Sequence, residues 1–152
     1  MQRKTQCGFT LMELLLVIAI IAIMAAMAIP VLGTFINRTQ IDATTDDVVS
    51  ALRYAQQKAA ASQEDSRYGV YFDDPNNAFY IFRGDAFGVN PSENIKYTYP
   101  NAITISQSFV GNEVNFEKLH GTTADTGTIT ITNTSGDTKQ VTINSAGTIE
   151  KN

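Results

Sequence analysis

One acidic residue, Glu13, lies at the start of a long apolar stretch, because residues 14–29 are all apolar. A carboxylate in such a segment is costly, about 2.5 to 3.5 kcal/mol at the centre of a membrane helix, and it usually has a functional partner. A cut after Gly8 would supply that partner, since Phe9 would then carry a free α-amino group and Glu13 would be the fifth residue of the new chain. The spacing indicates that Glu13 neutralises the amine of a neighbouring copy of the chain. This chemistry serves assembly and is not catalysis.

The apolar stretch has the length of a membrane span. Residues 11–32 would form a helix of roughly 33 Å, which matches the thickness of about 30 Å of a bilayer core. Arg3 and Lys4 precede the stretch, and the next basic residue is Arg38. The positive-inside rule then leaves the N-terminus in the cytoplasm and exports the rest. We predict a leader over residues 1–8, a transmembrane helix over residues 9–33 and an exported domain over residues 34–152.

Two simpler interpretations of the same stretch stay open. Ala26-Met27-Ala28 has the small-x-small form of an ordinary signal-peptide cleavage site, which would release a chain starting at Ile29. A plain single-pass anchor would also account for the length of the apolar stretch. Neither interpretation explains Glu13 or its spacing from Gly8.

Pro30 and Gly33 should weaken the helix near the end of the apolar stretch. Pro30 lacks an N–H group, and its ring would clash with the carbonyl of Ala26. Gly33 lowers the helix propensity of the same turn. The pair predicts either a helix end at the membrane surface or a turn at which a longer helix bends.

The exported domain begins with a helical pattern and continues with a strand pattern. Residues 34–62 contain no glycine and no proline, and they predict a helix continuous with the first one. The apolar positions 48, 52, 55 and 59 form one stripe that would face a sheet. Residues 67–150 then predict a β-rich region. The fold class is α+β, with a long N-terminal helix packed on an antiparallel β-sheet or a small β-sandwich.

The strand pattern is clearest at a hairpin and in the C-terminal tail. Aromatic-rich runs over residues 67–72 and 78–83 flank a five-residue Asp/Pro/Asn loop, as expected for a hairpin. Alternating Thr and Ile in the tail suit a half-buried strand surface. Further strands are predicted over residues 94–99, 102–109, 113–117, 128–132, 140–144 and 148–150.

The composition favours a structural role. The formal charge is −4, and losing Arg3 and Lys4 would make the chain more acidic, which argues against binding to nucleic acid. The single cysteine and the single histidine leave no nucleophile–base pair or metal set, so we expect no enzyme activity and no cofactor. Asp73 and Asp74 are weak candidates for a Ca²⁺ site, because carboxylates suit this ion. Aspartate is also common in turns.

The N-terminal residues resemble those of a known family. The basic leader ending in Gly8, the sequence Phe9-Thr10-Leu11-Met12-Glu13, the apolar helix and Pro30 are similar, in that order, to the N-termini of type IV pilins and type II secretion pseudopilins. The resemblance implies cleavage between Gly8 and Phe9 by a prepilin peptidase and N-methylation of Phe9. It also implies the pilin fold, and Glu13 would guide subunit addition into a filament. The expected partners are other subunits, the peptidase, the inner-membrane assembly platform and the lipid bilayer.

A second resemblance concerns the branch within this family. Residues 52–59 and the glycine-punctuated tail are similar to those of the H-type minor pseudopilins and FimT-like minor pilins. DNA-binding members of that branch carry arginines around the terminal glycine motif, whereas Thr148, Ile149 and Glu150 follow Gly147 here. A minor pilin or pseudopilin is therefore the leading interpretation. The alternative is a DNA-binding minor pilin for natural transformation.

Overall fold

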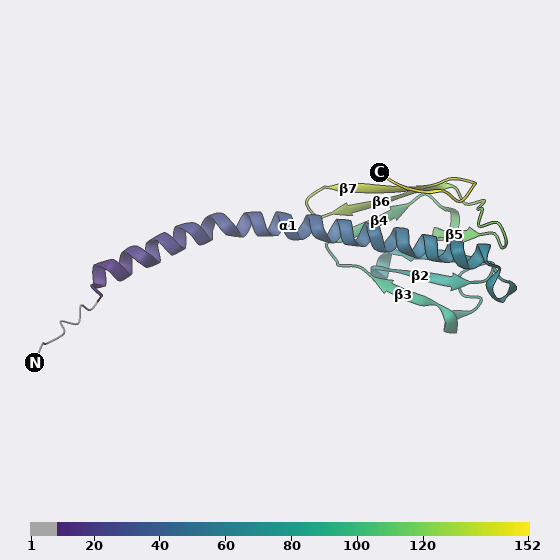
Figure 1. Ribbon diagram of the computed structural model, residues 1–152, viewed down its shortest axis with the longest axis horizontal. Helices are drawn as coiled ribbons and strands as arrows, with labels where there is room; N and C mark the ends of the chain where they lie inside the picture. Colours follow the sequence, from purple (N-terminus) through teal and green to yellow (C-terminus); the bar gives the residue numbers. More distant parts are fainter. Residues whose placement is uncertain (1–8) are drawn as a thin grey trace, which may run out of the picture. The chain divides into compact units, whose positions relative to one another are not determined.

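The described residues form one long helix and eight strands (Figure 1). The computed structural model describes residues 9–152, and their side chains are described in residues 9–27 and 33–152. Contacts divide the chain into two units, Met1–Ile36 and Asn37–Asn152. All of the strands belong to the second unit.

The two predicted helical stretches are a single helix. Helix α1 spans Leu11–Ala60 and includes Pro30 and Gly33. It ends two residues before the predicted limit, because Ser62 adopts a left-handed conformation with φ 48°. The backbone N–H of Leu119 donates to the carbonyl of Ala59 over 3.0 Å, so a distant loop closes the last turn. The bend predicted at Pro30 and Gly33 stays a prediction, and the side chain of Pro30 lies outside the described residues.

The strands follow the predicted order with small shifts at their ends. They are β1 (Tyr68–Asp73), β2 (Ala78–Arg83), β3 (Ile95–Thr98), β4 (Ile103–Gln107), β5 (Glu113–Phe116), β6 (Gly127–Asn133), β7 (Thr138–Ile143) and β8 (Ile149–Lys151). Short 3-10 turns are η1 (Gln63–Asp65), η2 (Asp74–Asn76), η3 (Pro91–Glu93) and η4 (Val110–Asn112). The predicted five-residue hairpin loop is one residue shorter, since Asp73 pairs with Ala78 and belongs to β1.

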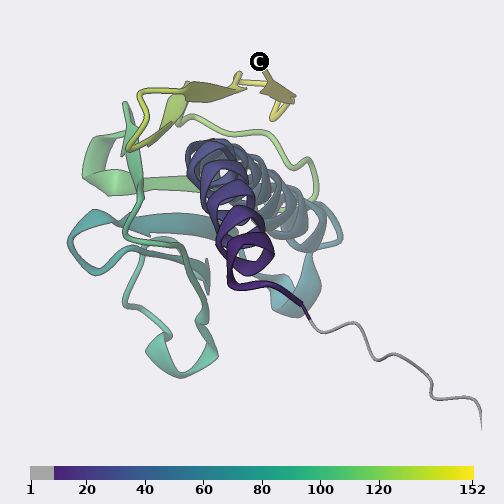
Figure 2. The same cartoon turned by 90° about the vertical axis from the view of Figure 1, so that its left-hand side faces the viewer.

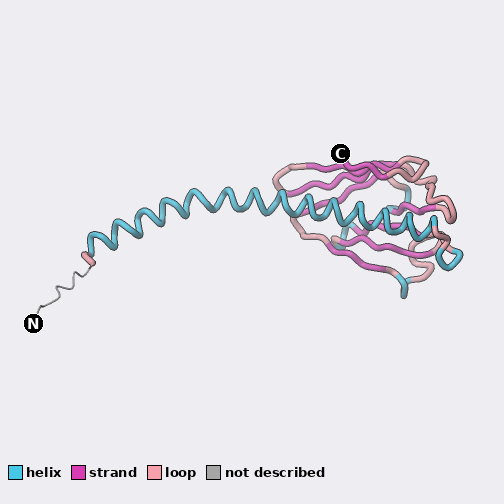
Figure 3. Tube along the Cα trace, in the orientation of Figure 1, coloured by secondary structure: helices cyan, strands magenta, loops and turns pink. Residues whose placement is uncertain are grey.

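The strands form two separate antiparallel sheets (Figure 3). The first has the order β3-β2-β1-β5 and the second the order β4-β6-β7-β8. In the first sheet, β1 and β2 pair as the predicted hairpin, with Phe72 opposite Phe79. Strand β5 reaches the other side of β1 although the two are about forty residues apart in the sequence. The prediction of a helix on antiparallel β-structure is confirmed.

Both sheets pack against the same face of the helix (Figure 2). The predicted stripe on α1, formed by Val48, Leu52, Ala55 and Ala59, is fully buried, which confirms that prediction. The core also takes apolar side chains from β1, β2 and β5 of the first sheet and from β4, β6 and β7 of the second. Residues 37–60 of α1 are therefore the element that the two sheets share.

A glutamine of the helix fixes the C-terminal loops. The Nε2 atom of Gln56 donates to the carbonyl of Gly121 over 2.9 Å and to that of Gly147 over 2.7 Å. Gly147 has a φ of +79°, and a Cβ atom there would lie 2.2 Å from the carbonyl oxygen of Gly121 and 2.5 Å from Gln56 Nε2. Only a residue without a side chain fits between the loop and the helix.

Substitution of Gly147 by alanine should destabilise the second unit, residues 37–152, strongly. Gly136 is a matched control, because its φ is +87° and a Cβ atom added to it would have no neighbour within 4 Å. Gly136→Ala should lower the free energy of unfolding by about 1–2 kcal/mol through backbone strain alone. Gly147→Ala should lower it by about 1–3 kcal/mol more, because of overpacking. Urea unfolding of a fragment of residues 34–152 measures both values, and equal losses would contradict the packing argument.

Candidate functional site at the helix N-terminus

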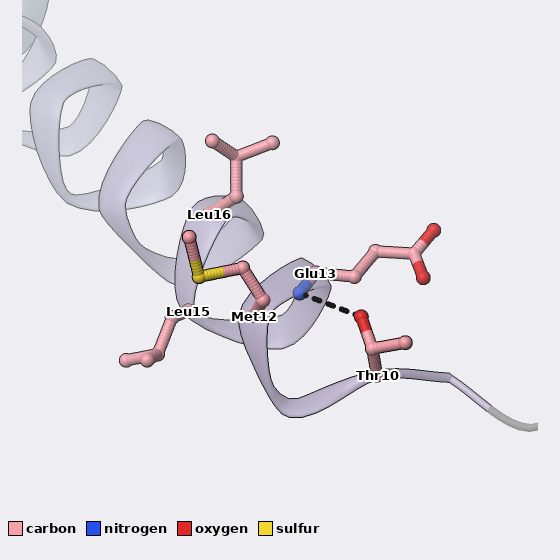
Figure 4. Close-up of a pocket in the computed structure, with 5 residues that line it drawn as sticks. All are labelled: Thr10, Met12, Glu13, Leu15 and Leu16. Atoms are coloured by element: carbon pink, nitrogen blue, oxygen red, sulfur yellow. Dashed lines mark hydrogen bonds between the residues drawn. The ribbon is translucent and has the colours of Figure 1, made fainter.

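Glu13 lies in the first turn of α1, and its carboxylate is exposed (Figure 4). Thr10, Met12, Glu13, Leu15 and Leu16 line a surface depression at this end of the helix. The backbone N–H of Glu13 lies 3.2 Å from the hydroxyl oxygen of Thr10 and 3.1 Å from its carbonyl oxygen. The structure gives the carboxylate itself no hydrogen bond or ion pair within the described residues. The Glu13 carboxylate is therefore available to bind a group that does not belong to the described residues.

The other residues predicted for this site are only partly covered by the structure. Phe9 is 81% exposed, directly before Thr10. Gly8, on the other side of the predicted cut, lies outside the described residues. The cleavage and N-methylation predicted at this pair stay predictions.

The helix that follows Glu13 presents apolar side chains on all its faces. Every large apolar side chain from Phe9 to Met27 is exposed, ranging from 46% for Val17 to 81% for Phe9. Exposed apolar surface of this extent marks a site of contact with other proteins or with lipid. The candidate site is thus one carboxylate at the head of an apolar surface that no described residue covers.

In the part of the chain whose side chains are described, no helix is both long enough and apolar enough to cross a membrane. The span over residues 9–33 stays a prediction.

The weak metal candidates lie at the β1–β2 turn, in the second unit. Both carboxylate oxygens of Asp73 accept hydrogen bonds from Nδ2 of Asn76, at 3.0 and 2.9 Å. Burial raises the pKa of Asp74, and the nearby charge of Asp73 raises it further. Burial also raises the pKa of Tyr99 to about 12, with smaller contributions from Asp74 and Asp73. Among the described residues, no group of three or more His, Cys, Asp or Glu side chains could hold a metal ion.

The C-terminal segment carries little free positive charge. Lys151 is the only basic residue after Gly147, and its Nζ lies 2.6 Å from a carboxylate oxygen of Asp46 on α1. Thr148 and Glu150 are exposed. Since its one cation is paired, this segment offers no basic surface of the kind that neutralises phosphates.

Two polar residues that organise the structure were not among those predicted from the sequence. One is Gln56, which binds two loops and gives no signal in the sequence. The other is Thr10, whose hydroxyl meets the backbone of Glu13. The pattern Thr-x-x-Glu before an apolar run is the sequence signal for such a contact.

Comparison with known proteins supports an N-terminal motif and a fold. Residues 3–29 match the prokaryotic N-terminal methylation motif. A fimbrial protein of Pseudomonas aeruginosa is 39% identical, over 45% of this chain and 50% of that protein. The type IV major pilin protein PilE of Neisseria gonorrhoeae is 31% identical, over 76% of this chain and 60% of that protein. The chain spans between half and two thirds of the length of these relatives.

Two solved structures share the fold at low identity. The type IV minor pilin FimU of Pseudomonas aeruginosa has a TM-score of 0.59 and 19% identity, and the match covers 73% of this chain and 91% of that one. The minor pseudopilin EpsH from the type 2 secretion system of Vibrio cholerae has a TM-score of 0.57 and 12% identity. That match covers 74% of this chain and 96% of the other. At these identities the two matches show a shared fold.

The buried phenol of Tyr99 predicts a loss of stability at high pH. A raised pKa in the folded state means that the unfolded chain loses this proton first, near the ordinary value of 10.0. The contribution of Tyr99 is therefore fully present below pH 10 and is lost as the pH rises to about 12. Tyr99→Phe keeps the ring and removes the titration. The difference in unfolding free energy between this variant and the unchanged fragment should shift in favour of the variant between pH 9 and about pH 12. A constant difference would contradict the assignment.

Proposed function

The chain belongs to the type IV pilin-like family, and we propose that it is a structural subunit of a type IV pilus or a type II secretion pseudopilus. The observation that carries the proposal is the position of Glu13. It lies five residues after Gly8, at the head of a helix whose large apolar side chains are exposed as far as Met27. The similarity to FimU and EpsH favours a minor pilin or pseudopilin.

The exposed apolar side chains of the helix fit two environments in succession, the lipid bilayer and the filament. Burying a Leu, Ile, Phe or Met side chain stabilises by about 1.5–3 kcal/mol, so a helix of such residues is strongly favoured in lipid or against other helices. We propose that the bilayer covers residues 9–33 before assembly and that the helices of neighbouring subunits cover them in the filament. Arg3 and Lys4 would keep the N-terminus in the cytoplasm, and residues 34–152 would be exported.

Glu13 would add a specific charge pair to the apolar contacts between subunits, which by themselves are not directional. Prepilin peptidase would cut between Gly8 and Phe9, and the Phe9 amine, after N-methylation, would carry a positive charge. In the apolar surroundings of the helix, that amine and a carboxylate attract each other much more strongly than they do in water. The amine of an incoming subunit would therefore pair with the Glu13 carboxylate of a subunit already in place at the inner-membrane assembly platform.

The proposal assigns the chain no catalytic activity and no cofactor, in keeping with relatives that are named as pilins and pseudopilins. No specific observation favours the DNA-binding alternative, since Lys151 at the C-terminal segment is paired with Asp46.

The N-terminal mass of the protein from cells with an active prepilin peptidase tests the cleavage site. We expect a chain that starts at N-methylated Phe9. Gly8→Arg should accumulate as the uncut precursor, because a long charged side chain replaces the small residue at the cut. Gln6→Arg is the matched control, as it adds the same charge two residues earlier and should still be cut. A chain starting at Ile29 would indicate an ordinary signal peptide, and an intact Met1 a plain anchor.

Removal of the Glu13 carboxylate should impair assembly without affecting export or cleavage. Leaving a buried amine without its partner costs about 3–5 kcal/mol, so Glu13→Ala should reduce incorporation into sheared filaments by at least about tenfold. Glu13→Asp keeps the charge and should retain part of the incorporation. Immunoblots of the filament fraction, normalised to cleaved subunit in the membrane, give the comparison. Normal incorporation of Glu13→Ala would refute the assembly role.

A further inference from the structure

Strand β3 is an end strand of the first sheet, and one row of its backbone groups has no partner. In an antiparallel pair, successive residues direct their N–H and C=O groups alternately toward and away from the neighbouring strand. The backbone N–H of Tyr99 donates to the carbonyl of Asn77 over 3.0 Å, and these two residues continue the register of β3 on β2. Lys96 and Thr98 therefore direct their backbone groups away from β2. No hydrogen bond to these groups is present among the described residues.

Strand β8 is an end strand of the second sheet and has a matching free row. Gln140 and Asn152 exchange two backbone hydrogen bonds, of 3.2 and 2.8 Å, and they continue the register of β8 on β7. Ile149 and Lys151 therefore direct their backbone groups away from β7. These groups, too, have no hydrogen-bond partner in the part of the chain that the structure describes.

Another end strand, β5, is covered by side chains of its own chain. The backbone N–H of Asn115 donates to the carboxylate of Asp125 over 3.0 Å, and its carbonyl accepts a hydrogen bond from the hydroxyl of Thr123 over 2.7 Å. An uncovered strand edge is a ready template for a strand of another chain. The outward edges of β3 and β8 have no such cover within the described residues, which makes them candidates for contact between chains.

On the side that faces the helix, both free edges carry an isoleucine. Ile95 lies opposite Ile81 of β2, and Ile149 lies opposite Ile143 of β7. Ile81 and Ile143 are buried in the shared core, whereas Ile95 is 42% exposed and Ile149 is partly buried. Each edge thus ends the core with an apolar side chain that a strand of another chain would cover.

On the outer side, the two edges carry opposite charges. Lys96 lies opposite Tyr80, and its Nζ is 5.6 Å from the centre of that ring. Glu150 lies opposite Thr142 of β7. Both charged side chains are exposed, and neither has an ion pair among the described residues. Lys96 of one copy and Glu150 of another would therefore attract each other if the two edges met.

The two strands also run in the same direction. Strand β1 starts near the end of α1 at Ala60, and β3 runs the same way because both are antiparallel to β2. The β6–β7 turn lies beside Asn37, whose Nδ2 donates to the hydroxyl of Ser135 over 2.8 Å, and β8 runs back toward this turn. Both strands thus run from the Ala60 end of the helix toward Asn37. Figure 1 shows β3 and the C-terminus at opposite margins of the second unit.

We propose that β3 of one copy pairs in parallel with β8 of a second copy, so that neighbouring subunits join their sheets edge to edge. When Lys96 lies opposite Glu150, the outward groups of Lys96 meet those of the two residues that flank Glu150 in β8. The same register places Ile95 opposite Ile149. Subunits of a helical filament meet through two different surfaces, as β3 and β8 are. This inference rests on the proposed role as a filament subunit, and it adds a contact between the second units of two copies.

A pair of cysteines measures this contact in filaments of the full-length, processed protein. Lys96→Cys and Glu150→Cys are combined in one chain with Cys7→Ser, which removes the native thiol. Opposed Cα atoms of neighbouring strands lie about 4.8 Å apart, within the range of a disulfide. Lys96→Cys with Thr148→Cys is the matched control, because a shift of two residues along β8 raises the separation to about 8 Å, beyond that range.

Oxidation of filaments with the opposed cysteines should give a ladder of covalent dimers, trimers and larger products. The control pair and each single cysteine should give at least about fivefold less dimer. The unchanged protein gives a second measurement, since a carbodiimide joins a carboxylate to an amine only where the two are in contact. Mass spectrometry of its covalent dimers should find the peptide that links Lys96 to Glu150.

Filaments in which neither the disulfide ladder nor the link between Lys96 and Glu150 forms would overturn the inference. Equal dimer yields from the opposed pair and from Lys96→Cys alone would also overturn it, because β3 would then meet a second β3. Links that join these residues only to a different protein would refute the assignment of a second copy. Failure of the unchanged protein to enter filaments would instead contradict the proposed function.

Discussion

Burial of one narrow stripe of α1 is the interaction on which the second unit, residues 37–152, depends. The two sheets share no strand, so no ladder of backbone hydrogen bonds joins them. Both sheets share the helix, whose residues Val48, Leu52, Ala55 and Ala59 are completely buried in the common core. Loss of this stripe would therefore weaken the packing of both sheets on the helix.

Polar contacts then decide how the C-terminal half sits on that helix. Asp42 pairs with Lys139 of β7 and Asp46 with Lys151 of β8, each at 2.6 Å. The hydrogen bond from Lys139 lowers the pKa of Asp42. Exposed pairs of this kind contribute only about 0–1 kcal/mol each, so they cannot hold the sheet in place by their energy. Together with Gln56, they select one register among the many that apolar packing alone would allow.

Elements with a regular spacing of apolar residues could be predicted from the sequence. Contacts between residues that are far apart in the sequence could not. The helix stripe and the strands of the hairpin follow directly from the spacing of apolar residues. The segment between β2 and β3 has no such period, yet it makes specific contacts. The ring of Phe87 stacks on that of Tyr71, with the two ring centroids 4.0 Å apart. The backbone N–H of Phe87 donates to the carboxylate of Glu113. These partners are far away in the sequence. The residues of the candidate site could be proposed from the sequence because they are close neighbours, although the contact of the Thr10 hydroxyl with the backbone N–H of Glu13 was not predicted.

In the assembly that we propose, the apolar side chains of residues 14–27 and the carboxylate of Glu13 would have different tasks. Leu, Ile and Met side chains of similar size pack against each other in many registers, and a slide by one helical turn of about 5.4 Å would change their buried area little. The same slide would move Glu13 by about 5.4 Å and break its contact with an amine. Apolar burial can therefore supply the energy of association without fixing the position of a subunit. In the assembly that we propose, one charge at a defined turn of the helix would fix that position and so offset the high solvation cost of an acidic residue there.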